Sequence, residues 1–133
     1  MKEVNLRKER YTLVNMFYRY LLMNNTVSEM KQQILDQSQG ELSDKGEDVA
    51  LDIAEKSPEI FNEIKDKLSD KWDLDRLPAL IKAILLVGAW EIKYTNTDKP
   101  IVINEMVNYC KDMEPDYDYK FVNAILDKFV KEQ

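Results

Sequence analysis

The chain has 133 residues, of which 44% are hydrophobic and 33% are charged, and its formal net charge is −6. This balance is typical of one folded domain, and it excludes a protein that coats nucleic acid by neutralising phosphates over its whole surface. The single cysteine, Cys110, excludes an intrachain disulfide and a thiolate zinc cluster. We therefore expect a single domain over residues 1–133.

The longest apolar run, Leu77 to Trp90, spans about 14 residues and is interrupted by Lys82, whereas a membrane helix needs about 20. The first residues include Glu3 and Asn5, where a secretory signal would be apolar. A lone cysteine also suits a reducing compartment. These features predict a cytoplasmic protein.

Helical periodicity is clear in the first half of the chain. Apolar residues spaced three and four apart predict a helix over about 6–23 and a weaker one over about 28–37, followed by a polar loop over 38–43. A periodic segment then runs through residues 49–54, and Ser57-Pro58 has the pattern of an N-cap with a first-turn proline. We therefore expect two helices to meet at this point.

The second half predicts three more helices. Asp75 can cap a helix that runs to about Tyr94, and this helix is apolar nearly all round, so we expect it at the centre of the fold. Two amphipathic helices follow over about 101–113 and 118–131. The predicted fold class is all-α, with about seven helices.

The residue inventory argues against catalysis. Histidine is absent, which removes the commonest general base and metal ligand, and the three glycines lack the spacing of a phosphate-binding loop. The acids Asp48, Asp52 and Glu55 fall at helical spacing, and a solvated helix face explains them better than a metal site does. We therefore expect no enzyme activity, no metal and no cofactor.

Positive charge is concentrated at the start of the chain. Residues 1–28 carry five basic and two acidic residues, against a net charge of −6 for the whole chain. Arg7, Lys8 and Arg10 lie in the first turn of a predicted helix, where cations oppose the helix dipole. The residues alone leave two interpretations open, a solvated helix start that Glu9 partly compensates or a surface that binds RNA phosphates.

A second candidate segment precedes the last helix. Tyr117, Tyr119 and Lys120 combine aromatic rings with a cation, and exposed rings of this kind can stack on the bases of a single strand. The alternative is that the tyrosines fix the last helix to the core.

From Arg76 onward the chain carries several short motifs in order. They are Arg76-Leu77, Ala83-Ile84-Leu85, Trp90-Glu91-Ile92, Ile103-Asn104-Glu105 and Lys120-Phe121-Val122-Asn123-Ala124-Ile125-Leu126-Asp127. The basic start that leads to Val14 and Phe17-Tyr18 adds to this set. In these motifs the chain resembles the bacterial antitermination factors of the NusB family, whereas residues 24–75 match that family only in length and helical character.

The resemblance implies an all-helical fold of two small packed bundles that binds RNA and has no catalytic step. Members of the family pair with the small-subunit ribosomal protein also called NusE. The pair binds the boxA element of nascent ribosomal transcripts, a single-stranded RNA, within the RNA polymerase antitermination complex.

The resemblance also implies roles for single residues. The residues implied in RNA binding are Arg7, Lys8, Arg10, Tyr119 and Lys120. Tyr18 matches a tyrosine at the NusE interface, and Ile81 stands at an interface position that is often acidic in the family. Leu86 and Ala124 replace a common arginine and the usual glycine, so partner contacts can differ here.

We expect the motif residues Asn104, Glu105 and Asn123 to act as caps and buried hydrogen-bonding groups. Two alternative functions stay open. The first is the helical RNA-binding portion of an rRNA cytosine methyltransferase, which shares this fold. The second is a protein-only scaffold, such as a homodimer, in which an aromatic residue anchors a helix-face interface.

Overall fold

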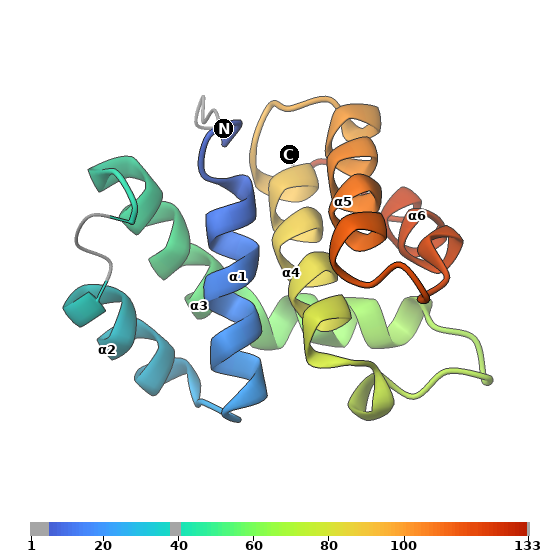
Figure 1. The fold of residues 1–133 in the computed structure, drawn as a ribbon, viewed down its shortest axis with the longest axis horizontal. Helices are drawn as coiled ribbons and strands as arrows, with labels where there is room; N and C mark the ends of the chain where they lie inside the picture. Colours follow the sequence, from blue (N-terminus) through green and yellow to red (C-terminus); the bar gives the residue numbers. More distant parts are fainter. Residues whose placement is uncertain (1–5, 38–40, 133) are drawn as a thin grey trace.

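The computed structural model describes residues 6–37 and 41–132, which form six α-helices and one short 3-10 helix (Figure 1). The elements are α1 (Arg10–Leu22), α2 (Val27–Gln37), α3 (Asp44–Lys67), η1 (Leu74–Arg76), α4 (Ala79–Tyr94), α5 (Lys99–Met113) and α6 (Tyr119–Asp127). The predicted all-α class is confirmed. The predicted loop over 38–43 lies partly outside the described residues.

Helix α4 is the centre of the fold, as its sequence predicts. It contacts α1, α3, α5 and α6, and every residue from Leu80 to Lys93 except Lys82 is buried. In Figure 1, α2 and α6 lie at opposite edges of the molecule, and α1 and α4 pack against each other between these edges. Among the described residues, no helix combines the length and the apolar character that a membrane span requires.

One boundary prediction was wrong, because α3 is a single helix that continues through Pro58. A proline inside a helix has no N–H to donate to the carbonyl four residues earlier, here that of Ala54. The hydroxyl of Ser57 donates to this carbonyl oxygen at 2.8 Å and replaces the missing donor. Ser57 therefore continues the helix instead of capping a new one, which reduces the predicted seven helices to six.

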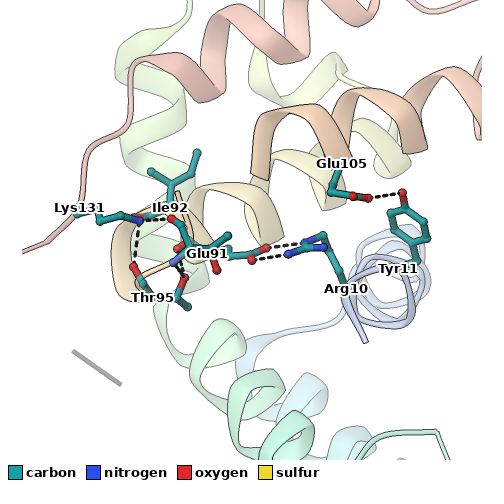
Figure 2. A network of polar contacts seen from close by, with 8 residues as sticks. Arg10, Tyr11, Glu91, Ile92, Thr95, Glu105 and Lys131 are labelled. Atoms are coloured by element: carbon teal, nitrogen blue, oxygen red, sulfur yellow. Dashed lines mark hydrogen bonds and ion pairs between the residues drawn. The ribbon is translucent and has the colours of Figure 1, made fainter. Parts of the chain in front are cut away.

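The ends of α4 and α6 also differ from the prediction. The 3-10 turn is capped by Asp73, and α4 begins only after Pro78, so Asp75 is not its cap. Helix α6 ends at Asp127, and the chain then turns back to the end of α4. There the ammonium of Lys131 donates to the backbone oxygens of Ile92 at 3.2 Å and Thr95 at 3.0 Å (Figure 2).

Candidate nucleic-acid interface

Residues 6–9, which we call the N-terminal turn, are fixed to the body of the protein. The side chain of Leu6 is buried, and its carbonyl accepts the N–H groups of Glu9 and Arg10 at 2.9 and 2.7 Å. The turn presents Arg7 and Lys8 at the surface. The two cations therefore stand on an ordered backbone just before α1.

Glu9 holds this turn against the start of α3. Its carboxylate accepts the N–H of Ser43 at 2.7 Å and the Ser43 hydroxyl at 2.8 Å. Gly46 lies so close that a Cβ there would overlap the Glu9 carboxylate. The acid at the start of α1 thus binds the N-terminus of α3, where its negative charge is favourable.

Arg10 does not lie at the surface, contrary to the expectation that it contacts RNA. It is 5% exposed, and its Nε and Nη2 atoms donate to Glu91 Oε1 at 2.8 Å and Oε2 at 2.7 Å (Figure 2). The hydrogen bond to Glu91 raises the pKa of Arg10, so the guanidinium stays charged. Glu91 is fully buried in α4, and a buried carboxylate requires a charged or hydrogen-bonding partner.

Contacts between α1 and α5 fix the relative direction of these helices. Tyr11 donates to Glu105 at 2.8 Å and stacks on Tyr109 with ring centroids 4.6 Å apart, and the Tyr109 hydroxyl donates to Asn15. Earlier residues of α1 thus meet earlier residues of α5, so the two helices run in the same direction. The N-terminal turn therefore lies toward the end at which α5 begins.

Tyr119 and Lys120 form the first turn of α6. The carboxylate of Asp118 caps this turn by accepting the Lys120 N–H at 3.0 Å, and the side chains of Tyr119 and Lys120 are exposed. Lys111, near the end of α5, places its ammonium 4.3 Å from the Tyr119 ring centroid.

Helices α5 and α6 run in opposite directions, because Lys99 contacts Asp127 whereas Lys111 contacts Tyr119. The start of α6 therefore lies at the far end of α5 from the N-terminal turn. The twelve residue steps from Lys99 to Lys111 extend roughly 18 Å along the helix. The structure does not bring the two predicted RNA-binding segments together into one cluster.

A groove between α5 and α6 was not predicted from the sequence. It has a volume of about 420 Å³ and is lined by Lys99, Pro100, Ile103, Asn104, Val107, Tyr119, Asn123 and Asp127. Asn104 and Asn123 are exposed here, so the expectation that they are buried structural groups was wrong. The signal in the sequence is their spacing: each asparagine falls between the inward-facing apolar positions of its helix, which places it on the outer face.

The two predicted partner-binding residues differ in exposure. Tyr18 is half-buried, and its α1 face continues one turn later into Leu22, which is 59% exposed. Ile81 is fully buried, so the expectation that it lies on a partner surface does not hold in this structure. Because α4 is covered by helices on all sides, an apolar side chain at position 81 joins the core.

Comparison with known proteins identifies the family of this chain. Residues 7–131 match the model described as the NusB family. The chain is 30% identical over 126 residues to the transcription antitermination protein NusB of a Nitratiruptor species, which covers 92% of this chain and 89% of that protein. The NusB protein of a Sulfurovum species is 32% identical over 126 residues, covering 92% of this chain and 95% of that protein.

The NusB protein of Wolinella succinogenes is 30% identical over 122 residues, covering 89% of this chain and 88% of that protein. All three relatives are named for transcription antitermination, not for a catalysed reaction.

Proposed function

This chain belongs to the NusB family, and we propose on that basis that it is a transcription antitermination protein that binds boxA-type RNA of nascent transcripts. In this proposal it acts with the small-subunit ribosomal protein also called NusE, within the RNA polymerase antitermination complex. The names of its relatives favour this function over the RNA-binding portion of a methyltransferase.

The observation that carries the RNA-binding proposal is the geometry of the N-terminal turn. Three contacts hold its backbone in place: buried Leu6, the Glu9 to Ser43 hydrogen bonds and the Arg10 to Glu91 pair just after the turn. Arg7 and Lys8 gain nothing from the helix dipole at this position, where a negative phosphate is favoured. We therefore assign them to the RNA phosphates and leave Arg10 out of the contact surface.

The start of α6 supplies the second proposed contact, through Tyr119 and Lys120. It lies toward the opposite end of α5 from the N-terminal turn, so one extended strand of RNA has to pass over several turns of helix to reach both segments. Single-stranded RNA suits this arrangement because its bases are free to stack on exposed rings while its phosphates meet cations elsewhere.

The protein partner is proposed to dock on the face of α1 that carries Tyr18 and Leu22. A tyrosine is the kind of anchor that protein interfaces use, and the exposed Leu22 one turn later extends the apolar surface beside it. The net charge of −6 makes the chain a weak RNA binder by itself, so a partner that adds positive surface would strengthen binding.

The test is a fluorescence anisotropy titration of labelled boxA RNA, with and without the ribosomal protein, at two salt concentrations. We expect binding that the partner strengthens and that salt weakens. The variant Arg7→Gln/Lys8→Gln should bind more weakly and reduce the salt slope by roughly 0.7 for each phosphate that is no longer neutralised.

The control variant Lys31→Gln/Lys65→Gln removes the same charge from α2 and the last turn of α3, and it should bind RNA almost as the parent does. If both variants lose the same amount of RNA affinity, the loss comes from the change in net charge, and the position of Arg7 and Lys8 in the N-terminal turn is not important. Self-association without RNA binding, measured by light scattering, would favour the homodimeric scaffold instead.

A further inference from the structure

The groove between α5 and α6 has a size and lining suited to a small planar ligand. Its volume of about 420 Å³ lies within the range of small-molecule sites, and it is open at the surface. One wall is apolar, formed by Pro100, Ile103 and Val107. Two exposed amides, Asn104 and Asn123, stand beside this wall, one on each helix.

This combination of groups is what recognition of an unstacked nucleobase requires. The two faces of a base are apolar and stack on rings or aliphatic side chains, whereas its edge carries hydrogen-bond donors and acceptors. An asparagine amide offers both a donor and an acceptor, so it can pair with a base edge. Tyr119 provides an aromatic ring at the end of the groove where α6 begins.

The position of Lys111 indicates which face of the Tyr119 ring is available. Its ammonium lies over the ring at 4.3 Å from the centroid, yet Lys111 does not line the groove. The cation therefore covers one face of the ring, and a base in the groove would stack on the opposite face. A cation over a ring also polarises it and fixes its orientation.

The charges near the groove favour a neutral base over a phosphate. The loop beside Tyr119 carries Glu114, Asp116 and Asp118, one charge more than the cations Lys111 and Lys120 that flank this loop, so its net charge does not attract phosphate. At the other end Asp127 lies 3.7 Å from the Lys99 ammonium, so the two charges offset each other. Arg7 and Lys8, the cations that the proposed function assigns to phosphates, stand elsewhere, at the N-terminal turn.

We propose that the α5–α6 groove takes one unpaired base of the bound RNA, which stacks on Tyr119 and forms hydrogen bonds with the amides of Asn104 and Asn123. This inference rests on the proposed RNA-binding function and extends it. It assigns base selection to the groove and phosphate binding to the N-terminal turn, so a change in either should affect a different property of the complex.

The experiment is a titration of the full chain with boxA RNA and with a series of the same RNA in which one base at a time is removed to leave an abasic sugar. We expect one abasic position to weaken binding to the parent about tenfold, which is the usual effect of losing one stacked base. The variants are Tyr119→Leu, which removes the ring, Tyr119→Phe, which keeps it, and Asn104→Ala/Asn123→Ala.

In the Tyr119→Leu variant, intact RNA should bind about tenfold more weakly and the sensitive abasic RNA should bind as it does to the parent. Tyr119→Phe should retain both the affinity and the sensitivity. When RNAs with each of the other three bases at the sensitive position are added to the series, the amide variant should distinguish them less well than the parent does while keeping its salt slope.

Each failure has a separate meaning. If the parent binds no RNA in any condition, the proposed function itself is wrong. If the parent binds RNA but Tyr119→Leu loses affinity equally for intact and abasic RNA, or for neither, the groove does not hold a base. Binding of the ribosomal protein that is weakened by Asn104→Ala/Asn123→Ala would show that the groove is a protein site and would overturn the inference.

Discussion

Arg10 and Glu91 form a two-point ion pair that is closed off from solvent and joins α1 to the central helix α4. The two residues are 81 positions apart in the sequence. Both carboxylate oxygens accept a hydrogen bond from the same guanidinium, which is the strongest geometry that this pair can adopt. A residue that the sequence suggests as a phosphate ligand therefore serves to neutralise a buried acid.

The first prediction concerns this pair. Arg10→Met should lower the free energy of unfolding by about 3–5 kcal/mol, because it leaves the Glu91 carboxylate buried without its counter-charge. Urea denaturation followed by circular dichroism measures this loss. In folded protein at low temperature, the variant should retain more RNA affinity than Arg7→Gln/Lys8→Gln does.

The double variant Arg10→Met/Glu91→Leu is the control, because it removes both charges and keeps apolar volume. It should recover most of the lost stability. A double variant as unstable as Arg10→Met would mean that the arginine acts through packing of its carbon chain and not through the carboxylate.

Most of the fold follows from helical periodicity, whereas the role of each charged residue does not. Arg7, Lys8 and Arg10 look equivalent in the sequence. The structure separates them, since Arg10 begins α1 and faces α4, whereas Arg7 and Lys8 lie in the N-terminal turn before the helix and stay at the surface. Glu91 offered a signal, because an acid inside an apolar helix needs a partner, but its partner is 81 positions away and many cations compete for it.

Three other departures have similar causes. The motif Ser57-Pro58 begins many helices, and the sequence does not show that here the Ser57 hydroxyl donates a hydrogen bond to the Ala54 carbonyl, as it does in the structure. The groove between α5 and α6 depends on how two helices face each other, which neither helix encodes alone. Ile81 differs from the expectation because all sides of α4 are covered.

The second prediction concerns the helix that passes through Pro58. Ser57→Ala should lower the free energy of unfolding by about 1–3 kcal/mol, because it leaves the Ala54 carbonyl buried without a donor. In the Pro58→Ala background, an N–H is restored at position 58, so the same serine substitution should cost clearly less. Urea denaturation of the four proteins in this cycle gives the coupling directly, and strict additivity of the two changes would contradict it.

The third prediction concerns alkaline pH. Burial, followed by the hydrogen bond to Glu105 and its charge, raises the pKa of Tyr11 from 10.0 to about 12. The folded state thus holds the proton more tightly than the unfolded state does between these values. The stabilising effect is complete below pH 10 and is lost as the pH rises toward about 12.

Tyr11→Phe should therefore make stability fall less steeply with pH over this interval, as measured by thermal unfolding at several pH values. Ultraviolet titration should also lose one late tyrosinate transition in the variant. If stability falls equally steeply with pH in the parent and the variant, the pKa of Tyr11 is not raised by its surroundings, and the prediction is wrong.

The last prediction separates the position of the N-terminal turn from its net charge. Removing an acid near two cations should strengthen RNA binding if charge alone matters, because the local potential becomes more positive. Glu9→Gln should instead weaken RNA binding several-fold, because it replaces the charged acceptor that holds the turn against Ser43. Anisotropy titration with boxA RNA measures the direction of the change.

Two further variants make this result specific. Glu59→Gln removes an exposed acid from the middle of α3, and it should leave RNA affinity unchanged or slightly higher. Gly46→Ala changes no charge, yet its Cβ would occupy the space of the Glu9 carboxylate, so it should weaken RNA binding as Glu9→Gln does. Glu9→Gln could instead raise the RNA affinity, as Glu59→Gln is allowed to do. Glu9 would then act only through its charge, and the contact between residues 6–9 and Ser43 would not be needed to hold Arg7 and Lys8 toward the RNA.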